Sequence, residues 1–207
     1  MDEYHKIDSV YKRDPDTSYK TFLVGQYTNA AFAYLARNLW RWTEKIDGTN
    51  VRVMIDKGAI QLGGRHESSQ MPIPLVTRLQ GMFFPLTEVL LEAFPNGACF
   101  YGEGYGGKIQ KGGNYRPDPS FILFDIRIGS VWLERENVEE IANKFGIDTV
   151  PDLGFGTLGE MIDEVTKGFP SKVGSCTAEG IVARPLVELC TRSGERIITK
   201  VKHKDFA

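Results

Sequence analysis

The sequence is poor in the residues that most often carry metal and redox chemistry. Its 207 residues include three cysteines and three histidines, and no Cys-x-x-Cys pair. Cys99, Cys176 and Cys190 are odd in number and widely spaced. A structural zinc site needs four closely placed cysteine or histidine ligands. The composition therefore argues against a zinc centre and favours three reduced thiols.

Long apolar runs and a large excess of charge are also missing. Apolar runs such as 121–124 are far too short to cross a bilayer, and the polar N-terminus lacks the apolar stretch of a secretory signal. We therefore expect a cytoplasmic protein. The formal net charge is −2, so any contact with nucleic acid must come from local clusters of cations. The 42% hydrophobic and 25% charged residues are typical of a globular protein with a packed core.

No internal repeat is visible, and no linker rich in proline, glycine and serine divides the chain. We therefore expect a single domain over residues 1–207. The strands are mostly connected as hairpins and the helices come between groups of strands, which predicts an α+β fold with antiparallel sheets. Strands are expected at 39–46, 51–55, 59–62, 98–103, 121–128, 131–133, 180–184 and 196–202, and helices at 85–94, 138–145 and 158–167.

The segment Glu44–Asn50, which reads Glu-Lys-Ile-Asp-Gly-Thr-Asn, is the most informative feature. It places Lys45 at the end of a predicted strand and before a tight turn, where a side chain is exposed but rigidly held. A lysine amine must lose a proton before it can attack phosphorus, although its reference pKa is about 10.4. Neighbouring cations and partial burial lower such a pKa. Taken alone, the segment fits a charged hairpin equally well.

Other candidate residues occupy strand ends, one strand face and a loop. Taken singly, they fit surface acids, a solvated basic edge and a core aromatic. Two lysines separated by one residue share a face of their strand, because side chains alternate along it. The set is Arg65, Glu103, Phe124, Glu179, Lys200 and Lys202.

The glycine-rich stretch 102–107 satisfies the spacing of a dinucleotide-binding turn. Such a turn must open a helix, whose N-terminus holds the pyrophosphate. Here the continuation is rich in glycine and ends at Pro117, so we reject that interpretation. This continuation contains Lys108, Lys111 and Arg116, with tyrosines nearby. Two alternatives stay open: a mobile loop that touches a nucleic acid backbone, or a flexible surface loop with incidental charge.

Taken together and in this order, these residues resemble the covalent nucleotidyltransferase superfamily of polynucleotide ligases and RNA capping enzymes, and most of all the RNA ligase 2-like family of phages. The nucleophile segment is similar to that family's, including Glu44 directly before Lys45. DNA ligases more often have an acid two residues before the lysine, where this chain has Thr43. The resemblance implies a nucleotidyltransferase domain of two antiparallel β-sheets with flanking helices and a nucleotide groove between the sheets.

The resemblance also implies a role for each position. Lys45 would attack the α-phosphate of ATP and hold AMP, and Asp47, Glu179, Lys200 and Lys202 would complete the catalytic set. The nucleotide would further contact Glu44, Ile46, Thr49, Asn50, Arg65, Glu103 and Phe124. The metal ligands would be Asp47, Glu103 and Glu179, and the nucleic acid contacts Arg65, Lys108, Lys111 and Arg116.

The function that the resemblance implies is that of an RNA ligase in RNA repair, dependent on ATP and Mg²⁺. It would join 5′-phosphate and 3′-hydroxyl ends through lysyl-AMP and an adenylylated nucleic acid end, and we expect a monomer. The family usually continues into a second domain; here Lys202 lies close to Ala207, so no C-terminal accessory domain is expected. Three rivals stay open: an ATP-dependent DNA ligase, a capping-type guanylyltransferase, and a nucleic-acid-binding module of the same fold that does no sealing.

Overall fold

The computed structural model describes residues 3–206, which form two compact units. The first unit contains 47–150 together with the N-terminal segment up to His5. The second contains 6–46 and the chain from Pro151 onward. The boundary between Ile46 and Asp47 divides the predicted nucleophile segment, so each unit carries part of it.

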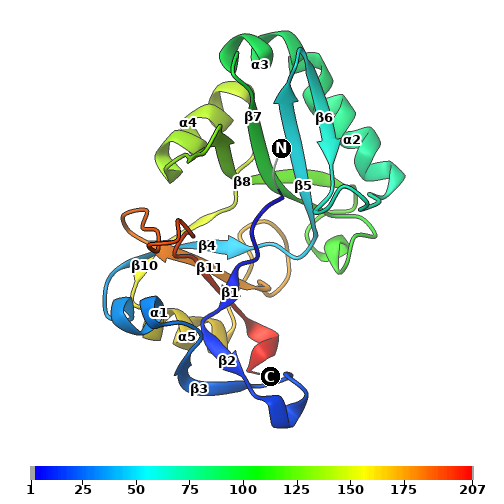
Figure 1. Ribbon diagram of the computed structural model, residues 1–207. Helices are drawn as coiled ribbons and strands as arrows, with labels where there is room; N and C mark the ends of the chain where they lie inside the picture. Colours follow the sequence, from blue (N-terminus) through cyan, green and yellow to red (C-terminus); the bar gives the residue numbers. More distant parts are fainter. Residues whose placement is uncertain (1–2, 207) are drawn as a thin grey trace. The chain divides into compact units, whose positions relative to one another are not determined.

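The first unit is built on a five-stranded antiparallel sheet in the order β6-β5-β7-β8-β9. Two hairpins of the sheet, β5–β6 and β8–β9, are closed by short turns at 57–58 and 129–130. Helices α2, α3 and α4 pack on one face (Figure 1). The strands are β5 (Thr49–Asp56), β6 (Ala59–Gly63), β7 (Ala98–Tyr105), β8 (Ser120–Ile128) and β9 (Val131–Trp132); the helices are α2 (Ile73–Phe83), α3 (Thr87–Ala93) and α4 (Arg135–Phe145).

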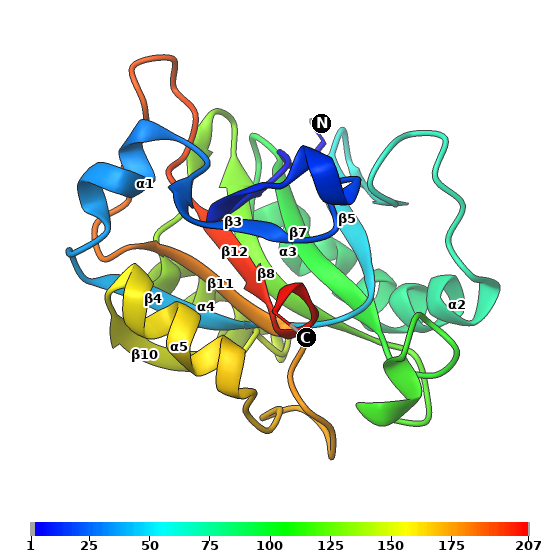
Figure 2. The same ribbon diagram turned by 90° about the horizontal axis from the view of Figure 1, so that it is seen from below.

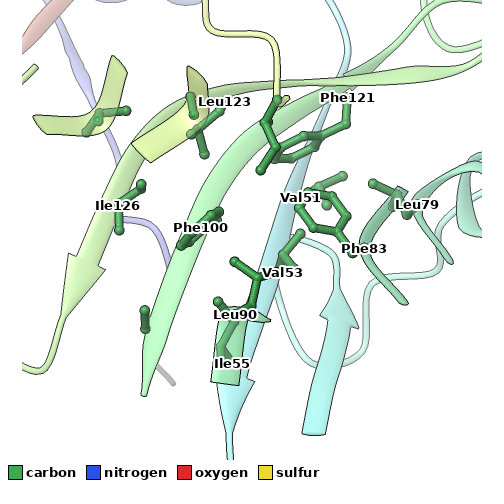
Figure 3. Close-up of a cluster of buried hydrophobic side chains, with 14 of the residues drawn as sticks. Val51, Val53, Ile55, Leu79, Phe83, Leu90, Phe100, Phe121, Leu123 and Ile126 are labelled. Atoms are coloured by element: carbon green, nitrogen blue, oxygen red, sulfur yellow. The ribbon is translucent and has the colours of Figure 1, made fainter. Parts of the chain in front are cut away.

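The core of this unit lies between the sheet and its helices. Strand β5 contributes Val51, Val53 and Ile55, all with fully buried side chains, as the alternation of a strand with one covered face requires. They pack against Leu79 and Leu90 from the helices (Figure 3). The residues between them on β5 therefore point to the sheet face that the helices leave uncovered.

The second unit has a five-stranded sheet in the order β1-β12-β11-β4-β10 and a separate hairpin, β2–β3. All pairings in the five-stranded sheet are antiparallel except β1 with β12. Figure 2 shows α5 running beside β4 and β11. The strands are β1 (Asp8–Ser9), β2 (Tyr11–Arg13), β3 (Phe22–Tyr27), β4 (Trp40–Lys45), β10 (Asp152–Gly156), β11 (Gly180–Pro185) and β12 (Thr199–Lys202); the helices are α1 (Ala30–Leu35) and α5 (Leu158–Lys167).

Helix α5 closes the core of the second unit. A capping box fixes its start, since the Thr157 hydroxyl accepts from the Glu160 amide while the Glu160 carboxylate accepts from Thr157. Its buried face packs against the sheet residues Trp40, Ile181 and Val201. The opposite face of this sheet is thereby left to the polar side chains of β4, β11 and β12.

The structure confirms the α+β class and corrects several predicted elements. The helix expected from Pro85 begins as a 3₁₀ turn, Phe84–Leu86, and α3 proper starts at Thr87. Leu90 and Phe94 form the buried side of this helix, whereas the Val89 side chain is exposed. Helix α2 and every element before residue 39 were not predicted, and β12 begins at Thr199 instead of at 196. None of the helices within residues 3–206 combines the length and apolarity needed to cross a membrane.

Candidate functional site

In the second unit, a row across three strands brings two predicted site lysines together. Gly180 on β11 pairs with Lys45 on β4 and with Lys202 on β12. Residues paired in this way share one face of the sheet. A side chain at Gly180 would collide with the carbonyl oxygen of Val201. The close approach of β12 therefore requires a glycine at the position between the two lysines.

The Glu179 carboxylate bridges these two lysines. Its Oε2 lies 2.6 Å from the Lys45 Nζ atom and its Oε1 lies 2.7 Å from the Lys202 Nζ atom. The three side chains are 11%, 20% and 22% exposed for Glu179, Lys45 and Lys202 respectively. Burial of the carboxyl opposes its ionisation, but the Lys45 charge and the hydrogen bonds from both lysines outweigh it and hold the pKa of Glu179 below its usual range.

Lys200 lies on the same sheet face, one row away. It pairs with Val182 on β11, which in turn pairs with Thr43 on β4. Because Lys200 and Lys202 are two residues apart on β12, their side chains share a face as the sequence predicts. Three lysines and one carboxylate thus lie together at this end of the face, with a formal charge of +2 (three positive, one negative). Such a face attracts an anion.

Glu44 faces away from this cluster and is 1% exposed. Its Oε1 accepts a hydrogen bond from the Ser171 hydroxyl at 2.5 Å, and its Oε2 accepts from the Lys172 backbone amide at 2.8 Å. The loop that it anchors is closed by the backbone bond from Ser171 to Cys176 at 2.8 Å and leads directly to Glu179. Ile46, the other neighbour of Lys45, is buried. The Glu44 carboxylate therefore ties the nucleophile strand to the loop before Glu179.

In the first unit, the turn after the nucleophile strand packs tightly on β7. The Asp47 backbone amide donates to the Tyr115 hydroxyl at 3.2 Å. A side chain at Gly48 would collide with the Gly104 carbonyl oxygen. Thr49 pairs with Gly104 at the start of β5. The close approach explains why a glycine must follow Asp47.

Asn50 and Glu103 are directly paired neighbours on β5 and β7. They lie on the sheet face that the helices leave uncovered, since Val51 points into the helix-covered core. The Asn50 Oδ1 atom is buried and has no hydrogen-bond partner within residues 3–206. A buried acceptor without a donor is costly unless a ligand or water supplies one. Asn50 is therefore suited to receive a hydrogen bond from a bound group.

A β-bulge turns Phe124 to the same face. The β7–β8 register shifts so that Gly102 pairs with Leu123 and Tyr101 with Asp125. Since Leu123 and Ile126 both lie in the helix-covered core, the two residues between them point the other way. Phe124 is partly exposed, and the Tyr4 ring packs against it edge-on with centroids 4.9 Å apart.

Arg65 is exposed in the loop after β6. The buried Arg52, on β5, donates to the Gly64 carbonyl oxygen at 2.8 Å and so fixes the residue before Arg65. The next residue, His66, contacts the Glu3 carboxylate at 2.7 Å through its Nδ1 atom. The Arg65 side chain thus stands on a loop that is held at both sides.

The glycine-rich loop from 106 to 119 is folded on itself. Gly112 packs so closely on Gly106 that a side chain there would contact the backbone at 2.6 Å. The Gly107 amide donates to the Arg116 carbonyl oxygen at 3.0 Å. Lys108 and Lys111 are exposed and Arg116 is partly buried. The structure places these three cations in the first unit and on one compact loop.

Comparison with known proteins was made at the level of sequence and of structure. The sequence matches the RNA ligase family over residues 38–202, which is more than half of the chain. The chain belongs to the RNA ligase family. A comparison with curated proteins found no match.

Solved structures of RNA ligase variants from Naegleria gruberi share the fold of this family member. A variant with ATP and Mn gives a TM-score of 0.69 at 17% identity, covering 98% of this chain and 56% of that chain. A variant with AMP and Mn gives 0.65 at 18% identity, covering 98% and 60%. An apo variant gives 0.66 at 15% identity, covering 99% and 58%. This chain therefore spans somewhat more than half the length of those proteins.

In this RNA ligase family chain, the predicted metal ligands are divided between the two units. No group of three or more histidine, cysteine, aspartate or glutamate side chains placed to hold a metal occurs in the described part of the chain. Asp47 and Glu103 lie in the first unit and Glu179 in the second. Carboxylates are nonetheless the hard oxygen donors that suit Mg²⁺, which binds through one or two of them and keeps several waters. The unsatisfied acceptor of Asn50 beside Glu103 also fits a hydrated cation.

Several positioning residues of this family member could not be found from the sequence. Ser171, Arg52 and Tyr4 act through Glu44, the Arg65 loop and Phe124, respectively. Ser171 and Tyr4 lie far along the chain from the residues that they contact, and Arg52 acts through a backbone carbonyl.

Proposed function

We propose that this chain is an ATP-dependent RNA ligase whose nucleophile is Lys45. The observation that carries the proposal is the bridge in which Glu179 holds Lys45 and Lys202 on one sheet face, with Lys200 one row away. A face with this charge stabilises the spread negative charge of a phosphoryl group in transfer. The family match over residues 38–202 supports the same conclusion.

In the first step, the Lys45 amine attacks the α-phosphorus of ATP. A nitrogen–phosphorus bond forms, the bond from the α-phosphorus to the bridging oxygen breaks, pyrophosphate leaves and the amine proton passes to solvent. Lys202 and Lys200 neutralise the non-bridging oxygens. Glu179 orients Lys45 before ATP arrives, since its Oε2 already contacts the Nζ atom.

The first unit supplies the recognition of the nucleotide in this proposal. Phe124 offers a ring face for the adenine, which gives stacking without reading the base edges. Glu103 and Asn50 receive the ribose hydroxyls, and Thr49 and Ile46 flank the nucleotide. Arg65 contacts a phosphate or the nucleic acid end. Both units act on the same ATP, so that residues 1–207 work as one nucleotidyltransferase domain.

Mg²⁺ is the proposed divalent cation. Asp47, Glu103 and Glu179 would hold it through its hydration shell, and the cation would neutralise charge on the phosphates when bound. Glu179 is shared with two lysines, so its contact with the cation goes through water. Glu44 contributes by anchoring the Ser171 loop, as its contacts indicate.

The second and third steps join the ends. The 5′-phosphate of the RNA attacks the phosphorus of lysyl-AMP, which releases Lys45 and leaves an adenylylated end. The 3′-hydroxyl then attacks the 5′-phosphorus and AMP leaves. Lys108, Lys111 and Arg116 contact the RNA backbone, and the enzyme works as a cytoplasmic monomer in RNA repair.

The experiment incubates the protein with Mg²⁺ and α-labelled ATP or GTP, and then with nicked RNA or DNA duplexes. We expect label from ATP that survives denaturation, is absent in Lys45→Ala, and is followed by sealing of RNA. Lys167→Ala, which removes an exposed lysine at the end of α5, is the matched control and keeps the label. Label from GTP alone would indicate a capping enzyme, and sealing of DNA alone a DNA ligase. Nucleic acid binding without any label would indicate a module that does no sealing.

A further inference from the structure

The second unit contains a cationic cavity that extends beyond the proposed catalytic lysines. Its volume is about 760 Å³, and it is lined by the N-terminal segment, the β2–β3 hairpin and the end of the chain. Seven lysines and arginines and only two carboxylates line it. The formal charge of the lining is therefore +5, in a chain whose net charge is −2. Positive charge is therefore concentrated in this cavity, although the protein as a whole has a negative net charge.

Most of these cations are not neutralised by acids. Lys6, Lys12, Lys20 and Lys204 are exposed, and no carboxylate lies within ion-pairing distance of them in residues 3–206. Among the other cations of the lining, Arg13 pairs with Asp205 at 2.7 Å and Lys202 with Glu179 at 2.7 Å. Unpaired cations that converge on one cavity are suited to several negative charges, because each keeps its full attraction for an anion.

The cavity is a built feature of the fold. The ion pair from Arg13 fastens the hairpin to the 3₁₀ turn His203–Asp205. The Phe22 ring packs edge-on against the Phe206 ring, with centroids 5.5 Å apart, and the Arg13 guanidinium lies 4.7 Å from the Phe22 centroid. The hairpin that carries Lys12 and the turn that carries Lys20 are therefore held against the C-terminal segment.

The cavity also begins at the proposed site of phosphoryl transfer. Its lining includes Lys200 and Lys202. Ser9 on β1 pairs with Lys200 on β12, and the Val10 amide donates to the Lys200 carbonyl oxygen at 3.2 Å. From Ser9 the chain runs through the bend at Val10 into β2 and reaches Arg13.

We propose that this cavity binds the phosphodiester backbone of the RNA strand whose end is joined at Lys45. The inference rests on the proposed ligase function and assigns a role to the N-terminal segment. The number and spread of its cations favour a strand over the other source of phosphate in the reaction, which is ATP. Five cations besides Lys200 and Lys202 line the cavity, and they come from the N-terminal segment, the β2–β3 hairpin and the end of the chain. The pyrophosphate portion of ATP has only two phosphates, whereas a nucleic acid strand carries one on every nucleotide.

The experiment compares two double variants that each remove two positive charges. Lys12→Gln with Lys20→Gln neutralises the cavity, and Lys144→Gln with Lys167→Gln neutralises exposed lysines outside it. Binding is measured with a nicked RNA duplex that lacks the 3′-hydroxyl and so cannot be sealed, at several salt concentrations. Self-adenylylation is measured in parallel over a range of ATP concentrations. Melting temperatures verify that both variants are folded.

We expect the cavity variant to bind RNA on the order of tenfold more weakly than wild type, with the slope of log affinity against log salt reduced by about 2, because two phosphate contacts are lost. The control variant should bind as wild type does. Equal affinity and equal slope for the two variants would overturn the inference. So would a raised KM for ATP with RNA binding intact, which would assign the cavity to the triphosphate. Wild-type protein that binds RNA but takes no label would refute the proposed ligase instead.

Discussion

The two units hold their parts of the proposed site in different states. In the second unit the charges are already paired: Glu179 contacts Lys45 and Lys202 at 2.6 and 2.7 Å. In the first unit, groups that are proposed to recognise the nucleotide lack a hydrogen-bond partner or are exposed to solvent. The Asn50 Oδ1 atom has no partner within residues 3–206, and Arg65 is exposed on its loop.

This difference separates interactions that form when the protein folds from interactions that form only when the ligand binds. An ion pair present before substrate binds contributes to stability and makes it depend on pH. A group that waits for a ligand contributes to affinity and little to stability. Substitutions in the Glu179 bridge of the second unit should therefore change stability and the chemical step together, and substitutions at the recognition face of the first unit should change nucleotide binding alone.

Glu179→Gln should have the largest effect. It removes the charge that orients Lys45, so we expect the rate of self-adenylylation to fall at least tenfold and the melting temperature at pH 7 to fall as well. The pKa of Glu179 is lowered by folding, so its stabilisation is fully present above the unfolded value of about 4.3 and is lost as the pH falls through the lower folded pKa. The difference in melting temperature between variant and wild type should shrink in that acidic range; a difference independent of pH would contradict the ion-pair account.

Glu44→Ala should be the next most damaging change. It leaves the Lys172 amide and the Ser171 hydroxyl, whose hydrogen bonds are partly buried, without their acceptor, which costs about 1–3 kcal/mol of unfolding free energy. Denaturant unfolding measures this cost. Glu164→Ala, on the exposed face of α5, is the control and should stay within about 0.5 kcal/mol of wild type. Equal stability of the two variants would show that Glu44 does not anchor the loop.

Gly48→Ala tests the close packing of the turn in the first unit. The added methyl group would collide with the Gly104 carbonyl oxygen, and we expect a loss of about 1–3 kcal/mol, as for other overpacked positions. Gly81→Ala is the matched control, since Gly81 lies in α2 with no atom within 4 Å of the added group. There the gain in helix propensity should stabilise the protein by about 0.5–1 kcal/mol. A change in unfolding free energy of the same sign for both variants would refute this packing.

Asn50→Ala should have the smallest effect on stability. Because the Oδ1 atom has no partner in the described chain, the free energy of unfolding should change by less than about 0.5 kcal/mol. The KM for ATP in self-adenylylation should nevertheless rise about 2- to 10-fold, the equivalent of one lost hydrogen bond. A destabilised variant with an unchanged KM would place Asn50 in the scaffold and remove the contrast between the units.

The sequence predicts local features of this protein better than it predicts their assembly. Alternation places Lys200 and Lys202 on one face and Val51, Val53 and Ile55 in the core, because these depend on residues close in sequence. The row through Lys45, Gly180 and Lys202 joins β4 to β11, which lies more than a hundred residues further along the chain, and no local pattern encodes it. The sequence predicts no structure before residue 39 for the same reason, since β1 pairs with β12 from the opposite end of the chain.

The bulge at Phe124 shows a second limit. The aromatic was predicted in a buried strand, but strict alternation cannot place both Phe124 and Asp125 on one face. Only the register between β7 and β8 reveals that they share it. Helix α2 is a different case. Leu75, Leu79 and Phe83 recur at helical spacing, so the sequence does contain a helical pattern here, although two prolines at its start argue against a helix.

The most direct test of the account is to locate the AMP. Wild-type protein is incubated with ATP and Mg²⁺, digested without acid treatment and analysed by peptide mass spectrometry. The account predicts one adenylylated peptide, modified at Lys45, with Lys200 and Lys202 unmodified. AMP on Lys200 or Lys202 instead, in protein that retains the Lys45 contact with Glu179, would contradict the assignment of the nucleophile.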